Sequence, residues 1–293
     1  MKKKILFYGN CGLSTIGRWL YENDSDRFEV LDCEECGVHP FQSTKNFAIW
    51  MDRIETQKNY YKCVHEKIKE ADYFIFQGVE QAAIDELKTD YLISNIVTGT
   101  SVAVPNPRFY AYPVDRYSAI PFVKYVYNNI TKNKQEIIKY LREENDPKFK
   151  EIVFSEYEKG MKENKRRFEM QSLTSNYSID ILSFVENNWK EHQLFGTHNH
   201  PIGLYWKETI SQLFKILELS LDSNKVDELF YPNKSVILDL KQFNFMNTIF
   251  PDLKAPEEIP IKLNLDKLGQ YEAHNLGMVY EPMEQYNECA RKI

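Results

Sequence analysis

Short apolar runs alternate with segments of helical spacing over the N-terminal third of the chain. Uninterrupted apolar runs of this length are typical of parallel strands that are buried on both faces. Strands are expected at Lys4–Tyr8, Phe28–Leu31, Ala71–Phe76 and a fourth run drawn from Asn95–Val97 or Ser101–Val104. The segments with helical spacing between them are Leu13–Tyr21, Phe47–Lys69 and Gln81–Leu87. This alternation predicts an α/β fold, with a Rossmann-like or SGNH-like parallel sheet in the N-terminal part.

The alternation stops after the fourth run. From Val104 to Pro121 the chain is rich in proline and aromatic residues, which predicts a long ordered loop. Residues 122–224 carry apolar stripes at helical spacing, and the remainder has several prolines and no clear pattern. We therefore predict a single elaborated α/β domain over residues 1–293, with a sheet core at about 1–120, a helical portion at about 121–225 and an irregular tail at 226–293.

Composition and charge narrow the class of protein. The chain has 43% apolar and 27% charged residues and a net charge of −6. A field of this sign does not attract nucleic acid or an anionic membrane, although a local basic pocket for a phosphorylated cofactor is compatible with it. No apolar stretch reaches bilayer length or forms a signal peptide, and the five cysteines do not indicate a disulfide framework. We expect a cytoplasmic protein with no nucleic-acid partner and no integral membrane contact.

The turn expected after the first strand, Gly9-Asn10-Cys11-Gly12, is the first candidate for chemistry. Open parallel sheets bind ligands at the carboxyl ends of their strands. Free backbone N–H groups at a helix start favour the nucleophilic thiolate of a cysteine and can stabilise an oxyanion. The two glycines allow a substrate to approach the backbone closely. The alternative is a buried structural cysteine in a tight turn.

Known phosphate- and nucleotide-binding loops do not match this turn. Gly9, Gly12 and Gly17 lack the spacing of a dinucleotide fingerprint, and a Walker Gly-Lys-Ser/Thr sequence is absent. Low-molecular-weight tyrosine phosphatases need the pattern Cys-x5-Arg, whereas Arg18 lies one position too far from Cys11. A phosphatase is therefore disfavoured.

A second candidate is Gly196-Thr197-His198-Asn199-His200-Pro201, which precedes an expected helix. Histidines at a loop-to-helix junction are suited to act as general bases. They could also ligate a metal, but no third ligand accompanies them, or they could simply be exposed at a helix start. The layout resembles that of SGNH-type esterases and acetyltransferases, with Cys11 in place of their serine and Thr197 in place of their acid. A thiolate–imidazolium pair can act without that acid.

Three blocks together resemble the WcbI family of polysaccharide biosynthesis enzymes. Ile5–Cys11 resembles the family's Gly-Asn-Cys-Gln start, Ala71–Gln77 its aspartate-strand-glutamine block, and Leu194–Pro201 its late Asn-His-Pro motif. The resemblance implies a coenzyme A-binding acetyltransferase that acts on capsular or related sugars. It also implies a Rossmann-like sheet elaborated with helices. Gly12 stands where the family has glutamine, which points to a different acceptor or weakened catalysis.

Acyl transfer on this pattern assigns roles to individual residues. Cys11 is expected to be the nucleophile or to orient the thioester, and His200 the base, with His198 as a second candidate. The Gln77 side chain and the backbone N–H groups after Cys11 would hold the oxyanion. The expected substrates are acetyl-coenzyme A and a saccharide acceptor, with no metal. The residues expected to contact coenzyme A are Gly9, Asn10, Gly12, Arg108 and Arg116. The two arginines flank the aromatic loop, which carries Phe109, Tyr110, Tyr112 and Tyr117.

Two further clusters have a structural as well as a functional interpretation. Cys33-x-x-Cys36-x-x-His39, with Cys63-x-His65, has the spacing of half a zinc site or of a redox pair, but free thiols are expected. The basic run Lys165–Arg167 could bind the phosphates of coenzyme A, but a solvated helix face is expected. The alternatives to a transferase are an SGNH-like carbohydrate esterase and a non-catalytic, sugar- or nucleotide-binding member of the family.

Overall fold

The computed structural model describes residues 2–8, 13, 16–17, 20, 26–31, 66–77, 99–113, 116–219 and 240–254. The chain divides into two compact units. The sheet unit comprises Met1–Asn106, Lys165–Ile181 and Thr209–Phe230. The aromatic unit comprises Pro107–Asn164, Leu182–Glu208 and Tyr231–Ile293. That the chain behaves as the single domain expected from its sequence stays a prediction.

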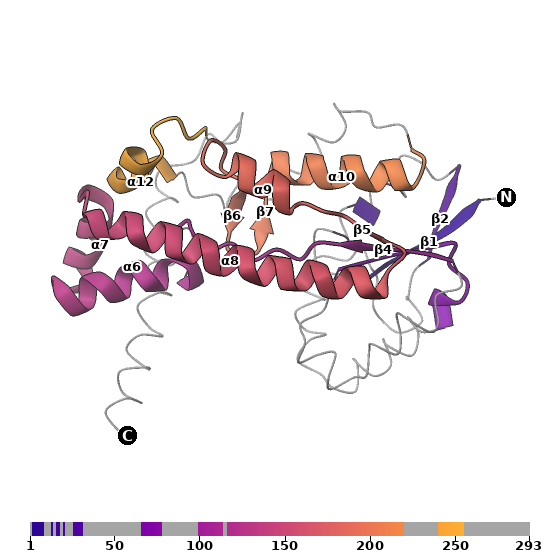
Figure 1. Cartoon of the computed structure of the whole chain (residues 1–293), viewed down its shortest axis with the longest axis horizontal. Coiled ribbons are helices and arrows are strands. Elements are labelled where there is room, and N and C mark those ends of the chain that lie inside the picture. The colour runs from indigo at the N-terminus through magenta and orange to yellow at the C-terminus, as the bar shows by residue number, and fades with distance from the viewer. Residues whose placement is uncertain are drawn as a thin grey trace, which may run out of the picture. The chain divides into compact units, whose positions relative to one another are not determined.

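A five-stranded parallel sheet is the core of the sheet unit (Figure 1). Its strands are β1 (Lys3–Tyr8), β2 (Phe28–Leu31), β3 (Tyr73–Gln77), β4 (Thr100–Val104) and β5 (Tyr177–Ser178), in the order β2-β1-β3-β4-β5. The predicted α/β fold with a parallel sheet is thereby confirmed. β4 comes from the second of the two runs proposed for it, while Asn95–Val97 lies outside the described residues.

Burial of consecutive strand residues explains why the sheet is parallel. Phe74, Ile75 and Phe76 of β3 are 1%, 0% and 1% exposed. Because successive side chains point to opposite faces, burial of all three requires cover on both faces of the sheet. Fully burying a side chain of this size contributes about 1.5–3 kcal/mol. After β1, the residues described as helical and buried include the three that the sequence places on one face: Leu13, Ile16 and Leu20.

Beside its backbone pairing with β4, the edge strand β5 is tied to β4 by an exchange of hydrogen bonds between Asn176 and Ser101. The Oδ1 of Asn176 accepts hydrogen bonds from the backbone N and the hydroxyl of Ser101, at 2.8 and 2.9 Å. The backbone N of Asn176 in turn donates to the Ser101 hydroxyl, at 2.9 Å. These bonds fix a strand that is too short to leave a pattern in the sequence.

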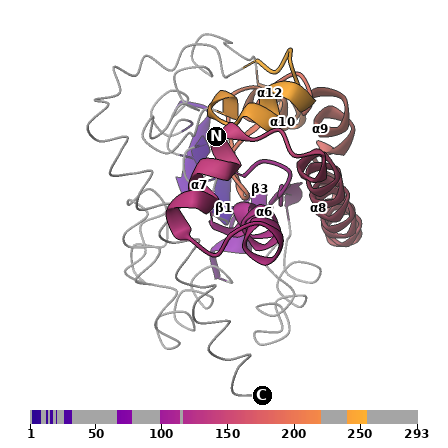
Figure 2. The same ribbon diagram turned by 90° about the vertical axis from the view of Figure 1, so that its left-hand side faces the viewer.

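Helices and a short hairpin form the aromatic unit (Figures 1 and 2). The helices are α6 (Arg116–Asn129), α7 (Lys134–Glu143), α9 (Leu182–Asn188), η2 (Leu240–Gln242) and α12 (Asn244–Ile249). Two longer helices, α8 (Pro147–Thr174) and α10 (Leu204–Ile216), begin in this unit and end in the sheet unit. The antiparallel hairpin consists of β6 (Phe195–Thr197) and β7 (His200–Pro201). η2 and α12 lie in the part of the chain that the sequence left without a pattern.

The predicted loop is shorter than expected at its C-terminal end. α6 begins at Arg116 and contains Pro121, whose nitrogen cannot donate a helical hydrogen bond. Ala119, Phe122 and Val126 form one face of α6 and are at most 4% exposed. Burial of this apolar face offsets the missing bond, so tertiary packing overrides the local signal of the proline.

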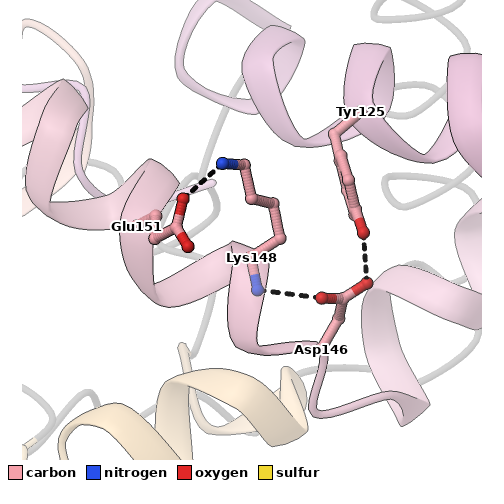
Figure 3. A network of polar contacts seen from close by, with 4 residues as sticks. All are labelled: Tyr125, Asp146, Lys148 and Glu151. Carbon is pink, nitrogen blue, oxygen red and sulfur yellow. Dashed lines mark hydrogen bonds and ion pairs between the residues drawn. The ribbon is translucent and has the colours of Figure 1, made fainter.

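The start of α8 is fixed by Asp146, the residue before its first turn (Figure 3). Asp146 Oδ1 accepts from the backbone N of Lys148 at 2.8 Å, and Pro147 occupies the first helical position. This is the usual chemistry of a helix N-terminus, where an acidic cap satisfies a free N–H and proline loses no bond. Lys148 also forms an ion pair with Glu151 one turn later.

Two tyrosines connect the Asp146 carboxylate to the neighbouring helices α6 and α7. Tyr125 of α6 and Tyr140 of α7 donate to Asp146 Oδ2, at 2.7 and 3.0 Å. Partial burial acts to raise the pKa of Asp146, but the hydrogen bonds from Tyr125, Lys148 and Tyr140 outweigh it and hold that pKa below its ordinary value. The carboxylate therefore links α6, α7 and the start of α8.

Trp189 lies within the aromatic core of this unit and is 1% exposed. Tyr157 stacks on it at 4.1 Å, and Phe250 meets it edge-on at 5.1 Å. The hydroxyl of Tyr112 donates to the backbone oxygens of Trp189 and His192. Burial raises the pKa of Tyr112 well above its ordinary value, so the hydroxyl stays a hydrogen-bond donor. This core supports the segments that carry the candidate histidines.

Candidate functional site

The carboxyl ends of β1 and β3 lie side by side. Tyr8, the last residue of β1, pairs with Phe76, and Gln77 follows at the end of β3. The strand order reverses its direction here, since β2 lies on one side of β1 and β3 on the other. Such a topological switch point is where open α/β sheets bind ligands. The first candidate turn directly follows β1, although Gly9, Asn10, Cys11 and Gly12 lie outside the described residues.

Gln77 ties the end of β3 to the loop after β4. Its side chain is buried, and its Nε2 donates to the backbone oxygen of Pro105 at 3.0 Å. This contact uses one of the two N–H groups of the glutamine amide. The position of Gln77 at the switch point suits the role expected from the sequence, which stays a prediction.

The two candidate histidines lie in the turn and second strand of the β6–β7 hairpin. His200 pairs with Thr197 across the hairpin and is exposed. His198 lies in the turn and is half-buried between the rings of Tyr110 and Tyr117. Its backbone oxygen accepts from the N of Phe109 at 2.7 Å, which attaches the aromatic loop to the hairpin. The exposed His200 is therefore better placed than His198 to meet a substrate.

Arg108 is held through its backbone by α8. Its N donates to Asn164 Oδ1 at 2.7 Å, and its oxygen accepts from Asn164 Nδ2 at 2.9 Å. Gly160, one turn earlier, leaves room for this contact, because a Cβ there would lie 2.9 Å from the Arg108 oxygen. We call this arrangement the Asn164 clamp. It fixes the start of the aromatic loop on α8, where Arg108 is half-buried.

The Asn164 clamp is the main element that the sequence analysis missed. Asparagine is disfavoured in helix interiors, because its side chain competes for backbone hydrogen bonds. An asparagine near the middle of the 28-residue α8, four residues after a glycine, was the signal that could have found it.

The basic run on α8 is only partly solvated. Lys165 and Arg166 are exposed, as expected for a solvated face. Arg167 is half-buried and donates to the backbone oxygen of Asn106 at 3.2 Å. This contact holds the chain just after β4, before the aromatic loop begins.

The structure distributes the other expected site residues as follows. Gln77 belongs to the sheet unit, whereas His198, His200, Arg108 and Arg116 belong to the aromatic unit, with Arg116 as the first residue of α6. The pairing of Cys11 with His200 therefore stays a prediction. The cysteine–histidine cluster lies outside the described residues, at Cys33, Cys36, His39, Cys63 and His65.

Within the described residues, no group of three or more His, Cys, Asp or Glu side chains is arranged to hold a metal ion. In the same part of the chain, no helix combines the length and the apolar character that a bilayer crossing needs.

Comparison with known proteins supports the fold. No family model matches the chain, and no curated protein matches it. A solved structure of WcbI, described as a novel polysaccharide biosynthesis enzyme, is similar with a TM-score of 0.52 and 15% sequence identity. The match covers 86% of this chain and 89% of the WcbI chain. That WcbI structure is described as the native protein without a disulfide bond between coenzyme A and a cysteine. At this identity the likeness shows a shared fold.

Proposed function

We propose that this protein is a coenzyme A-dependent O-acetyltransferase that acts on a sugar in cytoplasmic polysaccharide biosynthesis. The observation that carries the proposal is the switch point between β1 and β3, which directly precedes Gly9-Asn10-Cys11-Gly12. The fold shared with WcbI over most of both chains supports it, because the WcbI structure is described as the native protein without a disulfide bond between coenzyme A and a cysteine.

In the proposed reaction, the acceptor hydroxyl loses its proton to the imidazole of His200. In direct transfer, its oxygen forms a bond to the acetyl carbon as the C–S bond to coenzyme A breaks. In the covalent route, the Cys11 sulfur first takes the acetyl group as the C–S bond to coenzyme A breaks, and the acceptor oxygen then displaces the Cys11 sulfur from the acetyl carbon. The sulfur that leaves does so as a thiolate, and the proton held by His200 neutralises it. Gln77 and the backbone N–H groups after Cys11 would stabilise the oxyanion. Arg108 and Arg116 would contact the phosphates of coenzyme A.

A titration of the purified protein with coenzyme A tests the binding part of the proposal. A ligand that binds only the native state raises the melting temperature, so saturable heat in calorimetry should accompany a thermal shift. Absence of both at millimolar ligand would contradict the transferase, and hydrolysis of acetyl esters would then be tested. Binding without any turnover would favour the non-catalytic alternative.

Acetyl transfer by two variants tests the assigned residues. We expect Cys11→Ala and His200→Ala to lower kcat, and loss of a general base typically costs about 10²- to 10⁴-fold. His192→Ala is the matched control, because His192 lies in the same unit but outside the hairpin. Turnover of acetyl-coenzyme A that survives both substitutions would show that the assigned centre is wrong.

A further inference from the structure

Three aromatic side chains from three segments of the aromatic unit meet at the turn of the β6–β7 hairpin. The ring of Tyr110 is nearly parallel to that of His198, with centroids 5.8 Å apart and an angle of 11°. Tyr117, the second residue of α6, lies 4.7 Å from the same imidazole with its plane tilted by 59°. We call these three residues the ring corner, because two parallel rings meet a third that is inclined to them.

The ring corner rests on the buried core. Phe109, the neighbour of Tyr110, is 1% exposed and stacks on Phe195 of β6 at 4.4 Å. Its backbone N also bonds to the oxygen of His198. The ring corner is therefore fixed in place, yet Tyr117 is 48% exposed. A single exposed aromatic residue is ordinary, but one held against an imidazole that itself stacks on Tyr110, beside an exposed histidine, offers a preformed surface.

We propose that the ring corner binds the pyranose ring of the saccharide acceptor, an inference that rests on the proposed acetyl transfer. A general base must lie within hydrogen-bonding reach of the hydroxyl that it deprotonates. His200 is two residues from His198 on the same hairpin. The acceptor must therefore lie beside this hairpin, where the ring corner offers the exposed ring of Tyr117.

The geometry of the ring corner suits a sugar better than the adenine of coenzyme A. A pyranose has an apolar face of C–H groups and an edge of hydroxyls. An aromatic ring can cover that face, while phenol hydroxyls and imidazole nitrogens can bond to the edge. Adenine is flat on both faces and is best held between parallel rings, but the parallel rings of Tyr110 and His198 have centroids only 5.8 Å apart, and the plane of Tyr117 is tilted by 59° from that of His198.

Saturation-transfer NMR on the full chain tests this inference without requiring turnover. The probes are the methyl pyranosides of glucose, galactose, mannose and N-acetylglucosamine, with adenosine bisphosphate as the competing class. We expect at least one pyranoside to bind and Tyr117→Ala to weaken its binding about two- to twelvefold, which corresponds to the range of about 0.5–1.5 kcal/mol measured for contacts between aromatic rings. Tyr117→Phe should retain most of the binding because it keeps the ring.

Tyr177→Ala is the matched control, because Tyr177 is 51% exposed but lies on β5 of the sheet unit. It should leave pyranoside binding unchanged, and melting curves should show that all variants fold. If no pyranoside binds, or if Tyr117→Ala removes adenosine bisphosphate instead, the inference is overturned. Coenzyme A binding measured on the same samples separates the two proposals. A protein that binds coenzyme A but no Tyr117-dependent pyranoside retains the proposed function and loses only this inference.

Discussion

The two histidines of the hairpin have the same residue type but different surroundings. His198 is enclosed by Tyr110 and Tyr117, and its backbone holds the aromatic loop, whereas His200 is exposed. A residue that supports neighbouring rings cannot turn freely toward a substrate. Spacing in the sequence ranks the two histidines only weakly, whereas their contacts suit His200 to the proposed role of base and His198 to the proposed binding of the acceptor in the ring corner.

Asp146 provides a prediction at the residue scale that depends on pH. Its pKa is lowered in the folded state, so its carboxylate stabilises the fold above the ordinary value of 3.8, and that stability is lost as the pH falls through the lower folded value. Replacement of an N-cap typically costs about 0.5–2 kcal/mol. We therefore expect Asp146→Ala to lower the free energy of unfolding at neutral pH, measured by urea denaturation.

The difference between the wild type and Asp146→Ala should shrink as the pH falls below about 4. Glu158→Ala serves as the control, because Glu158 is an exposed residue of the same helix. An equal difference at pH 7 and at strongly acidic pH would contradict the role of the carboxylate and leave only the loss of packing.

At the scale of elements, α8 acts as a support for the aromatic loop as well as a helix. The Asn164 clamp holds Arg108 by both backbone groups, and Gly160 allows the loop to approach. The fold therefore requires particular residues on one face of α8 that neither amphipathic spacing nor helix propensity explains. Helix propensity taken alone would favour alanine over glycine at this position.

Gly160→Ala tests that requirement, because the two effects have opposite signs. In an exposed helix interior the change would stabilise the protein by about 0.5–1 kcal/mol. Here the new Cβ would meet the Arg108 oxygen at 2.9 Å, and a backbone atom cannot move away without disturbing the Asn164 clamp. We expect a lower melting temperature by calorimetry. An increase would show that the loop can yield and that the clamp is not tight.

At the scale of the whole molecule, two helices belong to both compact units. α8 and α10 each begin in the aromatic unit and end in the sheet unit. Unfolding either unit would break backbone hydrogen bonds in α8 and α10, which also form part of the other unit. The single domain expected from the sequence is therefore compatible with a chain that divides into two units.

Urea unfolding followed by two probes tests the coupling of the units. We expect far-ultraviolet circular dichroism and tryptophan fluorescence to give coincident transitions, as two-state behaviour requires. Trp189 and Trp206 report on the aromatic unit once Trp19 and Trp50 of the sheet unit are replaced by Phe, while helix content reports on both units. Two separated transitions would contradict the single-domain prediction.

The sequence by itself determined where the principal strands lie and that they are parallel. Apolar runs such as Ile5–Phe7 and Phe74–Phe76 can bury consecutive side chains only within a sheet that is covered on both faces. It also placed Gln77 and the two histidines in segments that the structure positions at a switch point and on an ordered hairpin. Local periodicity carries this information because each strand or helix buries its own pattern of residues.

Only the tertiary structure decided the strand order, the short β5, the Asn164 clamp and the ring corner. Each depends on contacts between residues far apart in the chain, such as Ser101 with Asn176 or Arg108 with Asn164. A single backbone hydrogen bond or ring contact leaves no periodic trace in a sequence. The difference between His198 and His200 likewise follows from which rings the fold brings to the hairpin, because the residue type alone is the same.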